Sequence, residues 1–278
     1  MVGFAFSPNL KDNIYEALRM AHYFGGELVF VHVGRKTSEK ESIFNEIVGS
    51  SPVQSEKISV HWRIGDPVRA LLQASKDFGV DLILLGALKR ENVLKFYLGS
   101  IARKITRKAK CSVLLLINPS VERQPCQHIV VNGLDSPQTK LTIEAAFVVA
   151  NALGVKKISL VEEISRSKVA VAVDDDRSLR RATLKKEKLR RQEQTRVKDV
   201  VQKLPAALTA DVNWTTQSIF GRRGYSIGHY AKLVRADLLV MNAQENLSFI
   251  DRFITRDIEH ILAELPTDVL IINLKGNE

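Results

Sequence analysis

Two stretches of the chain repeat one another, and this internal repeat constrains the fold more than any other feature of the sequence. The twenty residues from Ser7 (SPNLKDNIYEALRMAHYFGG) match those from Ser136 (SPQTKLTIEAAFVVANALGV) at an offset of 129 residues. The stretch from Gly65 (GDPVRALLQASKDFGVDLILLGA) matches that from Gly221 (GRRGYSIGHYAKLVRADLLVMNA) at an offset of 156 residues. We therefore predict a tandem duplication whose second copy carries 27 additional residues between its second and third strands.

Each copy alternates short runs of β-branched and leucine residues with helical patterns. Runs such as ELVFVHV and DLILLG are typical of strands buried on both faces, whereas Asn9 to Phe24 places its apolar residues on one helical stripe. This alternation predicts, in each copy, a parallel sheet with helices on both faces. The proline-containing segment from Asn118 to Gln127 marks the boundary, which gives domains over 1–118 and 126–278.

The composition is that of a globular protein, with 45% hydrophobic and 26% charged residues in 278. Neither the two cysteines, Cys111 and Cys126, nor the six histidines have the spacing of a disulfide framework or a metal site. The opening segment lacks the features of a signal peptide, and no run approaches the ~18 apolar residues of a membrane span. We therefore expect a cytoplasmic protein that does not span a membrane and holds no metal.

The segment after DLILLG contains the most informative motif for function. It has Gly86 and Lys89, then nine further residues before Gly99-Ser100 at the predicted start of a helix. Ligands of open parallel sheets bind outside the carboxyl ends of the strands, and a helix start presents backbone N–H groups to an anion. The motif therefore predicts an anion site at this edge of the first copy, although a tight strand exit and a plain helix start would also explain the glycines.

Together with Gly65-Asp66-Pro67 and the run CSVLLLI from Cys111, this pattern resembles the universal stress protein family. The resemblance covers nearly the whole chain apart from the insertion. It implies an α/β fold of two tandem, doubly wound, five-stranded parallel sheets in strand order 3-2-1-4-5. It also implies a stress-response protein with no catalytic residues, and it leaves a slow ATPase activity open.

The resemblance further implies one adenine nucleotide, ATP, in the first copy. The residues that it assigns to this site are Ser7, Val33, Gly86, Lys89, Gly99, Ser100 and Ile101. Lys89 stands where the family has its second glycine, and Ser7-Pro8-Asn9 lies near the position of the family's aspartate after strand 1. In the second copy the three glycines and the serine are replaced, by Asn242, Glu245, Thr255 and Arg256. No nucleotide is expected there, although Asp135 remains at the strand 1 position.

A different class of function is indicated by Gly224-Tyr225-Ser226-Ile227-Gly228, which satisfies the G-x-S-x-G pattern of serine hydrolases. Asp237 or Asp251, and then His260, follow in the chain order of that family. The repeat register argues against this function, because it places Ser226 in the helix that follows the third strand.

The 27-residue insertion is strongly basic. Arg177 to Lys203 contains eleven Lys and Arg against three Asp and Glu, and we predict an inserted helix over about 174–204 that docks at its C-terminal end. A solvated basic face explains this pattern, and so does contact with an anionic partner, whether nucleic acid, anionic lipid or an acidic protein.

The resemblance also bears on assembly. Family members dimerise through their terminal strands, so Ser112–Ile117 and Val269–Asn273 are expected to meet within one chain, and a homodimer is a further possibility. Related domains also occur as cytosolic regulatory pairs of membrane transporters, which is an alternative function for this chain.

Overall fold

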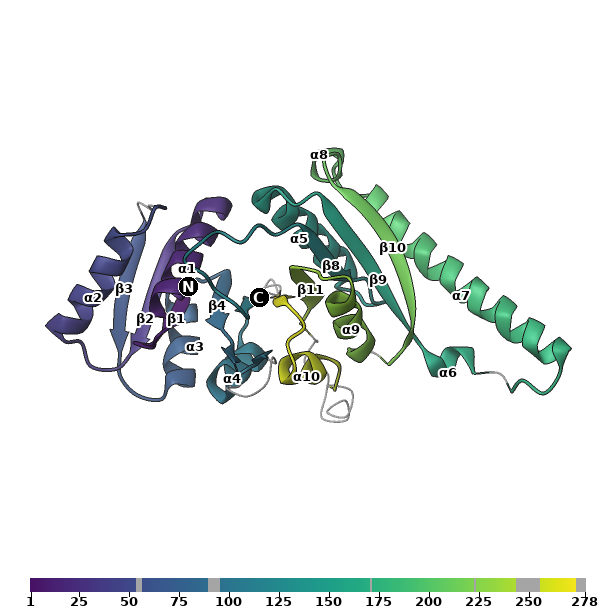
Figure 1. Ribbon diagram of the computed structural model, residues 1–278, viewed down its shortest axis with the longest axis horizontal. Coiled ribbons are helices and arrows are strands. Elements are labelled where there is room, and N and C mark those ends of the chain that lie inside the picture. The colour runs from purple at the N-terminus through teal and green to yellow at the C-terminus, as the bar shows by residue number, and fades with distance from the viewer. Residues whose placement is uncertain (54–56, 90–95, 171, 223, 244–255, 274–278) are drawn as a thin grey trace. The chain divides into compact units, whose positions relative to one another are not determined.

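The computed structural model describes the chain except for residues 54–56, 90–95, 171, 223, 244–255 and 274–278 (Figure 1). Contacts divide the chain into two compact units. Unit 1 comprises Met1–Pro125 and Asp268–Glu278, and unit 2 comprises Cys126–Thr267.

Unit 1 contains one main sheet, four helices and a short hairpin. The strands are β1 (Val2–Phe4), β2 (Leu28–Val33), β3 (Ile58–Arg63), β4 (Leu82–Gly86), β7 (Ser112–Leu116) and β12 (Asp268–Ile272), with β5 (Leu88–Lys89) and β6 (Phe96–Tyr97) in the hairpin. The helices are α1 (Leu10–Phe24), α2 (Ser38–Gly49), α3 (Pro67–Asp77) and α4 (Ser100–Lys108). The five parallel strands of the first copy lie in the order β3-β2-β1-β4-β7, which is the predicted 3-2-1-4-5 order.

The helices of unit 1 cover both faces of its sheet, as predicted. On β1 the ring of Phe4 lies 5.1 Å from that of Phe44 in α2, whereas a Cβ at Gly3 would meet Leu71 of α3. Successive residues of a strand point to opposite faces, so α2 and α3 lie on opposite faces. Because β1, β2, β3, β4 and β7 all run in the same direction, the segments that follow β1, β2, β3 and β4 meet at one edge.

A sixth strand, β12, joins this sheet beside β7. β12 belongs in sequence to the second copy, yet it pairs antiparallel with β7, with Val269 opposite Leu115 and Ile271 opposite Val113. The Asp268 carboxylate also accepts a hydrogen bond from the backbone N–H of Ile117 at 2.8 Å. The predicted meeting of these two strands is confirmed. The predicted α/β fold of mostly parallel strands is confirmed, and the antiparallel pairing of the terminal strand with β7 is added to it.

Unit 2 repeats the first part of the same topology. Its strands are β8 (His128–Asn132), β9 (Lys157–Ser165), β10 (Asn213–Gly221) and β11 (Leu238–Asn242), all parallel, in the order β10-β9-β8-β11. Its helices are α5 (Thr139–Leu153), α6 (Arg166–Val169), α7 (Asp176–Gln202), α8 (Ala206–Thr209), α9 (Tyr225–Leu233) and α10 (Arg256–Ala263).

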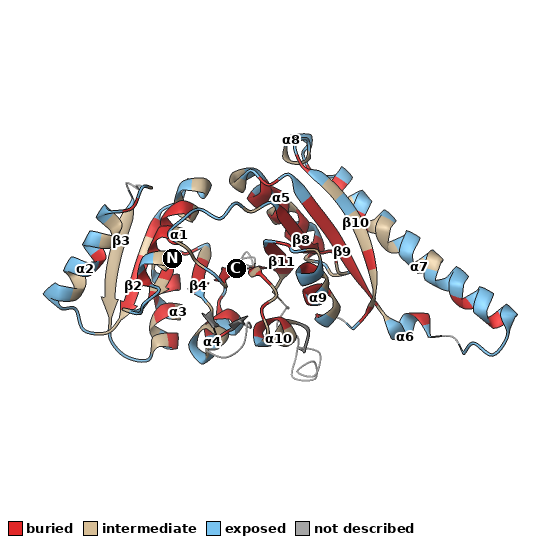
Figure 2. Ribbon diagram, in the orientation of Figure 1, coloured by how far each residue is buried: buried red, intermediate tan, exposed pale blue. Residues whose placement is uncertain are grey.

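The inserted basic segment forms α7, within the predicted span of about 174–204. Asp175 caps the helix by accepting a hydrogen bond from the backbone N–H of Ser178, which satisfies a donor that a helix start leaves free. Val197 and Val201, near its C-terminal end, are buried, whereas most of the helix is exposed (Figure 2). The helix is therefore docked at its C-terminal end, as the apolar stripe predicts, but Ser178 and Ala182 are buried as well, so it is also held near its start.

Candidate functional site

The structure brings the predicted nucleotide residues of the first copy to one edge of the sheet. Ser7 is exposed in the turn after β1, Val33 ends β2 and Gly86 ends β4. Helix α4 runs back toward the amino ends of the strands, so its start at Gly99-Ser100 lies at the same edge.

The start of α4 has no side-chain cap among the described residues. Gly99 is its N-cap residue, and it has no side chain that could accept a hydrogen bond from the first turn. By contrast, Thr37 caps α2 and Asp66 caps α3 through side-chain oxygens. The side chain of Leu98 is buried immediately before Gly99, which fixes where the helix begins. Ser100 is exposed in the first turn, and Ile101 beside it is 45% exposed, so this helix start faces solvent. The backbone N–H groups of a helix start and the helix dipole together favour an anion here.

Gly86 is required for close packing at the end of β4. A Cβ at this position would lie 2.8 Å from the amide oxygen of Asn13 in α1. The Asn13 amide is itself held, because it donates a hydrogen bond to the backbone oxygen of Asn9 at 2.7 Å. The glycine therefore allows α1 and the strand end to approach each other.

The spacing between Gly86 and Gly99 is taken up by a structure that sequence analysis missed. The two ends of this segment pair as the antiparallel strands β5 and β6, with Lys89 opposite Phe96. The backbone of Lys89, the residue at the family's second glycine, thus lies in a hairpin strand three residues after β4 ends.

Sequence analysis also missed an aromatic cluster at this edge, on the α2 face. The Phe6 ring stacks on Trp62 with centroids 6.1 Å apart and an angle of 16° between the ring planes. His32 lies between β1 and β3, 5.1 Å from Phe6 and 5.0 Å from Trp62, and its Nδ1 is 3.0 Å from the backbone oxygen of Phe4. The ammonium of Lys40 lies 5.4 Å from the Phe6 ring centroid. The sequence does contain a pattern that indicates this cluster. Phe4 and Phe6 are two residues apart at β1, Phe30 and His32 are two residues apart on β2, and the next strand, β3, carries Trp62.

The corresponding edge of unit 2 is occupied by its own side chains. The amide of Asn242, at the position of Gly86, donates to the Ser136 hydroxyl at 3.3 Å. Arg196 of α7 donates to the backbone oxygen of Gly133 and forms ion pairs with Glu193 at 2.9 Å and Asp135 at 3.9 Å. Asp135 is the carboxylate that the family resemblance assigns to the base side of a nucleotide, and here an arginine of the same chain lies beside it. Glu245 and Thr255 lie outside the described residues, and Arg256 begins α10.

Glu162 lies beneath this arginine. Its side chain is buried at 2% exposure; one carboxylate oxygen accepts a hydrogen bond from Ser218 at 2.8 Å, and the other has no partner among the described residues. Burial raises the pKa of the Glu162 carboxyl to about 7, although the Ser218 hydrogen bond and the charge of Arg196 act in the opposite direction.

The geometry at these two edges can be compared with known proteins. The profile of the universal stress protein family matches residues 50–116, which include β3 to β7. A universal stress protein from Synechocystis sp. is 24% identical over 92 residues, a match that spans 32% of this chain and 58% of the relative. Residues 50–116 of this chain thus match the universal stress protein family.

Solved structures share the fold over nearly the whole chain. A universal stress protein from Archaeoglobus fulgidus aligns with 100% of this chain and 97% of its own length, at a TM-score of 0.66 and 17% identity. A functionally unknown protein from Pseudomonas aeruginosa aligns with 99% of this chain and 91% of its own length, at a TM-score of 0.69 and 14% identity. Both likenesses concern the fold.

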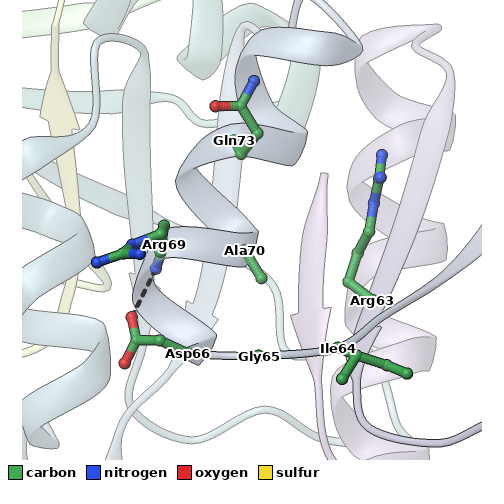
Figure 3. Close-up of a pocket in the computed structure, with 7 residues that line it drawn as sticks. All are labelled: Arg63, Ile64, Gly65, Asp66, Arg69, Ala70 and Gln73. Carbon is green, nitrogen blue, oxygen red and sulfur yellow. Dashed lines mark hydrogen bonds between the residues drawn. The ribbon is translucent and has the colours of Figure 1, made fainter.

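Unit 1 also carries a pocket beside the Gly65-Asp66-Pro67 turn, at the carboxyl end of β3. The pocket has a volume of about 420 Å³ and is lined by Arg63, Ile64, Gly65, Asp66, Arg69, Ala70 and Gln73 (Figure 3). One oxygen of the Asp66 carboxylate, at the wall of the pocket, accepts the backbone N–H of Arg69 at 2.9 Å and so caps α3. The conspicuous turn of this unit is thus explained by helix capping.

Of the hydrolase residues that the structure describes, Ser226 and Asp237 lie apart in unit 2. Ser226 lies in the first turn of α9 after β10, as the repeat predicts, and its hydroxyl accepts the backbone N–H of Arg222 at 3.0 Å. Asp237 lies at the opposite edge of the sheet, where it accepts the N–H groups of Gln127 and His128 at 2.8 and 2.9 Å. Asp251 lies outside the described residues.

In the part of the chain that the structure describes, no helix is both long and apolar enough to cross a membrane. In the same residues, no three His, Cys, Asp or Glu side chains are grouped so that they could hold a metal ion.

Proposed function

We propose that this chain is a tandem universal stress protein of the cytoplasm, a non-enzymatic binding protein of the stress response that holds one adenine nucleotide, ATP, in unit 1. The observation that carries the proposal is the uncapped start of α4 at Gly99-Ser100, which lies at the same edge as Gly86, Val33 and Ser7. An anion is the ligand that such a helix start favours.

Each part of the edge has a role in this proposal. The phosphates contact the backbone N–H groups and the hydroxyl at Gly99-Ser100, and the backbone of Val33 contacts the base side. Lys89, at the position of the family's second glycine, is assigned to the phosphates because its charge is opposite to theirs. The ring of Phe6, which follows β1 where the family has an aspartate, offers the base an apolar neighbour instead of a carboxylate.

Unit 2 holds no nucleotide in this proposal. The amide of Asn242 donates a hydrogen bond to the Ser136 hydroxyl, and Arg196 forms an ion pair with the carboxylate of Asp135. Since these groups already have partners, a nucleotide would have to displace an ion pair before it could bind.

The experiment compares three proteins by calorimetry with ATP, after mass spectrometry of the purified chain for a bound nucleotide. Gly99→Val places a branched side chain at the phosphate contact and should abolish binding. Gly26→Val is the matched control, because a Cβ at exposed Gly26 meets no atom within 4 Å. Equal affinity of wild type and Gly99→Val, or no binding up to millimolar ATP, would refute the nucleotide site.

A second candidate function rests on α7. The basic residues of this helix are largely exposed, so we propose that it contacts an anionic partner. This function is independent of the nucleotide site, because it uses a segment that the first copy lacks.

A further inference from the structure

One side of α7 presents a continuous row of cations. The basic face, as we name it, consists of seven exposed residues: Arg177, Arg180, Arg181, Lys185, Lys188, Arg191 and Lys198. They recur at spacings of three, four and seven, which places them on one side of a helix. The buried residues Ala182, Val197 and Val201 lie on the other side, so the basic face is directed away from the sheet (Figure 2).

The charges of the basic face are not used within the described part of unit 2. Arg191 forms an ion pair with Glu187 at 3.0 Å, and no other member of the face has an ion pair there. Arg196 shows the contrast, because it turns toward the sheet and pairs with Glu193 and Asp135. Three aspartates, at 174 to 176, precede the face, and Asp175 is engaged as the helix cap. The available cations therefore lie along the body of the helix rather than at its tip.

The length of the basic face and the residues that form it favour one class of anionic partner over the others. From Arg177 to Lys198 an α-helix rises by roughly 30 Å, close to the length of one turn of a nucleic-acid duplex. A duplex carries one phosphate charge per ~1.7 Å of its axis, so phosphates are available along the whole face. Four of the seven residues are arginines, whose planar guanidinium groups bind phosphate through two hydrogen bonds.

Other partners fit the face less well. A helix that binds a membrane surface needs a broad apolar face, but Val197 and Val201 are buried against unit 2, and the exposed large apolar residues of α7 are two leucines, Leu179 at 52% and Leu184 at 69%. Single-stranded nucleic acid is bound largely by stacking on aromatic side chains, and α7 contains no aromatic residue.

We propose that the basic face of α7 binds the phosphate backbone of double-stranded nucleic acid without sequence preference. This inference rests on the proposed contact of α7 with an anionic partner and names that partner. Because one side of the helix is packed on unit 2, the contact is made by side chains reaching to phosphates rather than by a helix reading base edges.

The test measures binding of the full chain to a mixed-sequence duplex of about three helical turns, between about 50 and 200 mM salt. The variant Arg181→Glu/Lys185→Glu/Lys188→Glu should lose roughly 100-fold in affinity at the lower salt, and the slope of log affinity against log salt should fall by about 3. The control, Lys76→Glu/Lys140→Glu/Lys156→Glu, has the same net charge, and its changes lie on exposed residues outside α7. It should stay within about threefold of the wild type, since these lysines are not on the basic face.

Each outcome decides between specific statements. A control that loses as much affinity as the α7 variant would show attraction by net charge alone and overturn the basic face as the site. Binding to anionic vesicles but not to the duplex would overturn the inference and leave the anionic partner standing. No binding to the duplex, to vesicles or to heparin at low salt would refute both. Circular dichroism of each variant checks that it is folded. The neutral variant Arg181→Gln/Lys185→Gln/Lys188→Gln should show an intermediate loss of affinity, which separates the effect of charge from that of unfolding.

Discussion

The carboxyl edges of the two units are built on the same strands but differ in chemistry. Phe4 at the end of β1 corresponds, at the repeat offset of 129, to Gly133 after β8. In unit 1 the space beside this residue is filled by rings, with His32 5.3 Å from Phe4. In unit 2 the glycine leaves room for Glu162 and for Arg196, which reaches the Gly133 backbone oxygen from α7.

The difference shows how a duplicated edge can lose its ligand and keep its fold. The strand order and the sheet core are common to both copies, because they depend on apolar residues within the strands. The groups after the strands are not fixed by the core. In unit 1 these groups provide no side-chain cap for the start of α4. In unit 2 they form a hydrogen bond between Asn242 and Ser136 and an ion pair between Arg196 and Asp135.

The largest expected effect tests whether α7 is part of the core of unit 2. Val197→Asp places a carboxylate at a side chain that is fully buried, and should lower the free energy of unfolding by at least about 4 kcal/mol. The matched control on the same helix is Leu184→Asp, which is 69% exposed and should change it by less than about 0.5 kcal/mol. Chemical denaturation measures both. Equal effects of the two substitutions would show that α7 is not docked through its C-terminal half.

The next effect concerns the buried acid that distinguishes unit 2. The pKa of Glu162 is raised from 4.5 to about 7, so between these values the folded protein holds a proton that the unfolded chain has lost. The free energy of unfolding should therefore fall as pH rises from about 4.5 to about 7, by roughly 3 kcal/mol, and then level off.

Glu162→Gln removes the titrating group and should remove this slope. Denaturation at a series of pH values compares it with Glu39→Gln, an exposed control in unit 1. A slope that persists in Glu162→Gln would assign the proton to another group.

A smaller effect concerns the helix that follows the third strand of each copy, α3 in unit 1 and α9 in unit 2. Helix α3 of unit 1 is capped by its own Asp66, whereas α9 of unit 2 begins at Gly224 and is capped from β9. The buried Glu163 carboxylate accepts the N–H groups of Gly224 and Ile227, both at 2.8 Å. Glu163→Ala should cost about 2 kcal/mol, because it leaves two buried donors unpaired, and exposed Asp66→Ala about 1 kcal/mol. Thermal denaturation that ranks these two in the reverse order would contradict this account of the caps.

The sequence predicts the fold well where a pattern of residues recurs at a fixed spacing. The repeat locates both copies, the 3.6-residue pattern locates α1 and α5, and the charge run with its acidic start locates α7. These features depend on local patterning, which a single chain displays directly. The placement of β12 beside β7 followed from a family resemblance, and its antiparallel direction became visible only in the structure.

The sites were less predictable, because they depend on contacts between distant residues. Nothing in the sequence near Gly224 indicates that Glu163, 61 residues away, caps α9. The contact of Arg196 with Gly133 spans 63 residues in the same way. The glycine and serine positions could be assigned from the motif, but the rings of Phe6 and Trp62 become neighbours only when β1, β2 and β3 assemble into one sheet.

The smallest expected effect uses those rings to report whether the ligand binds beside them. The chain has two tryptophans, Trp62 at the aromatic cluster and Trp214 in β10 of unit 2. In the variant Trp214→Phe only Trp62 emits, and a base that enters beside Phe6 should change the polarity around the stacked pair and shift the emission slightly on addition of ATP. In the variant Trp62→Phe the remaining Trp214 should give no response, since it lies at the amino end of β10, away from the carboxyl edge of the sheet. A response from Trp214 alone would contradict a site at the aromatic cluster. A Trp62 response that survives Gly99→Val would show that the base side binds without the phosphate contact.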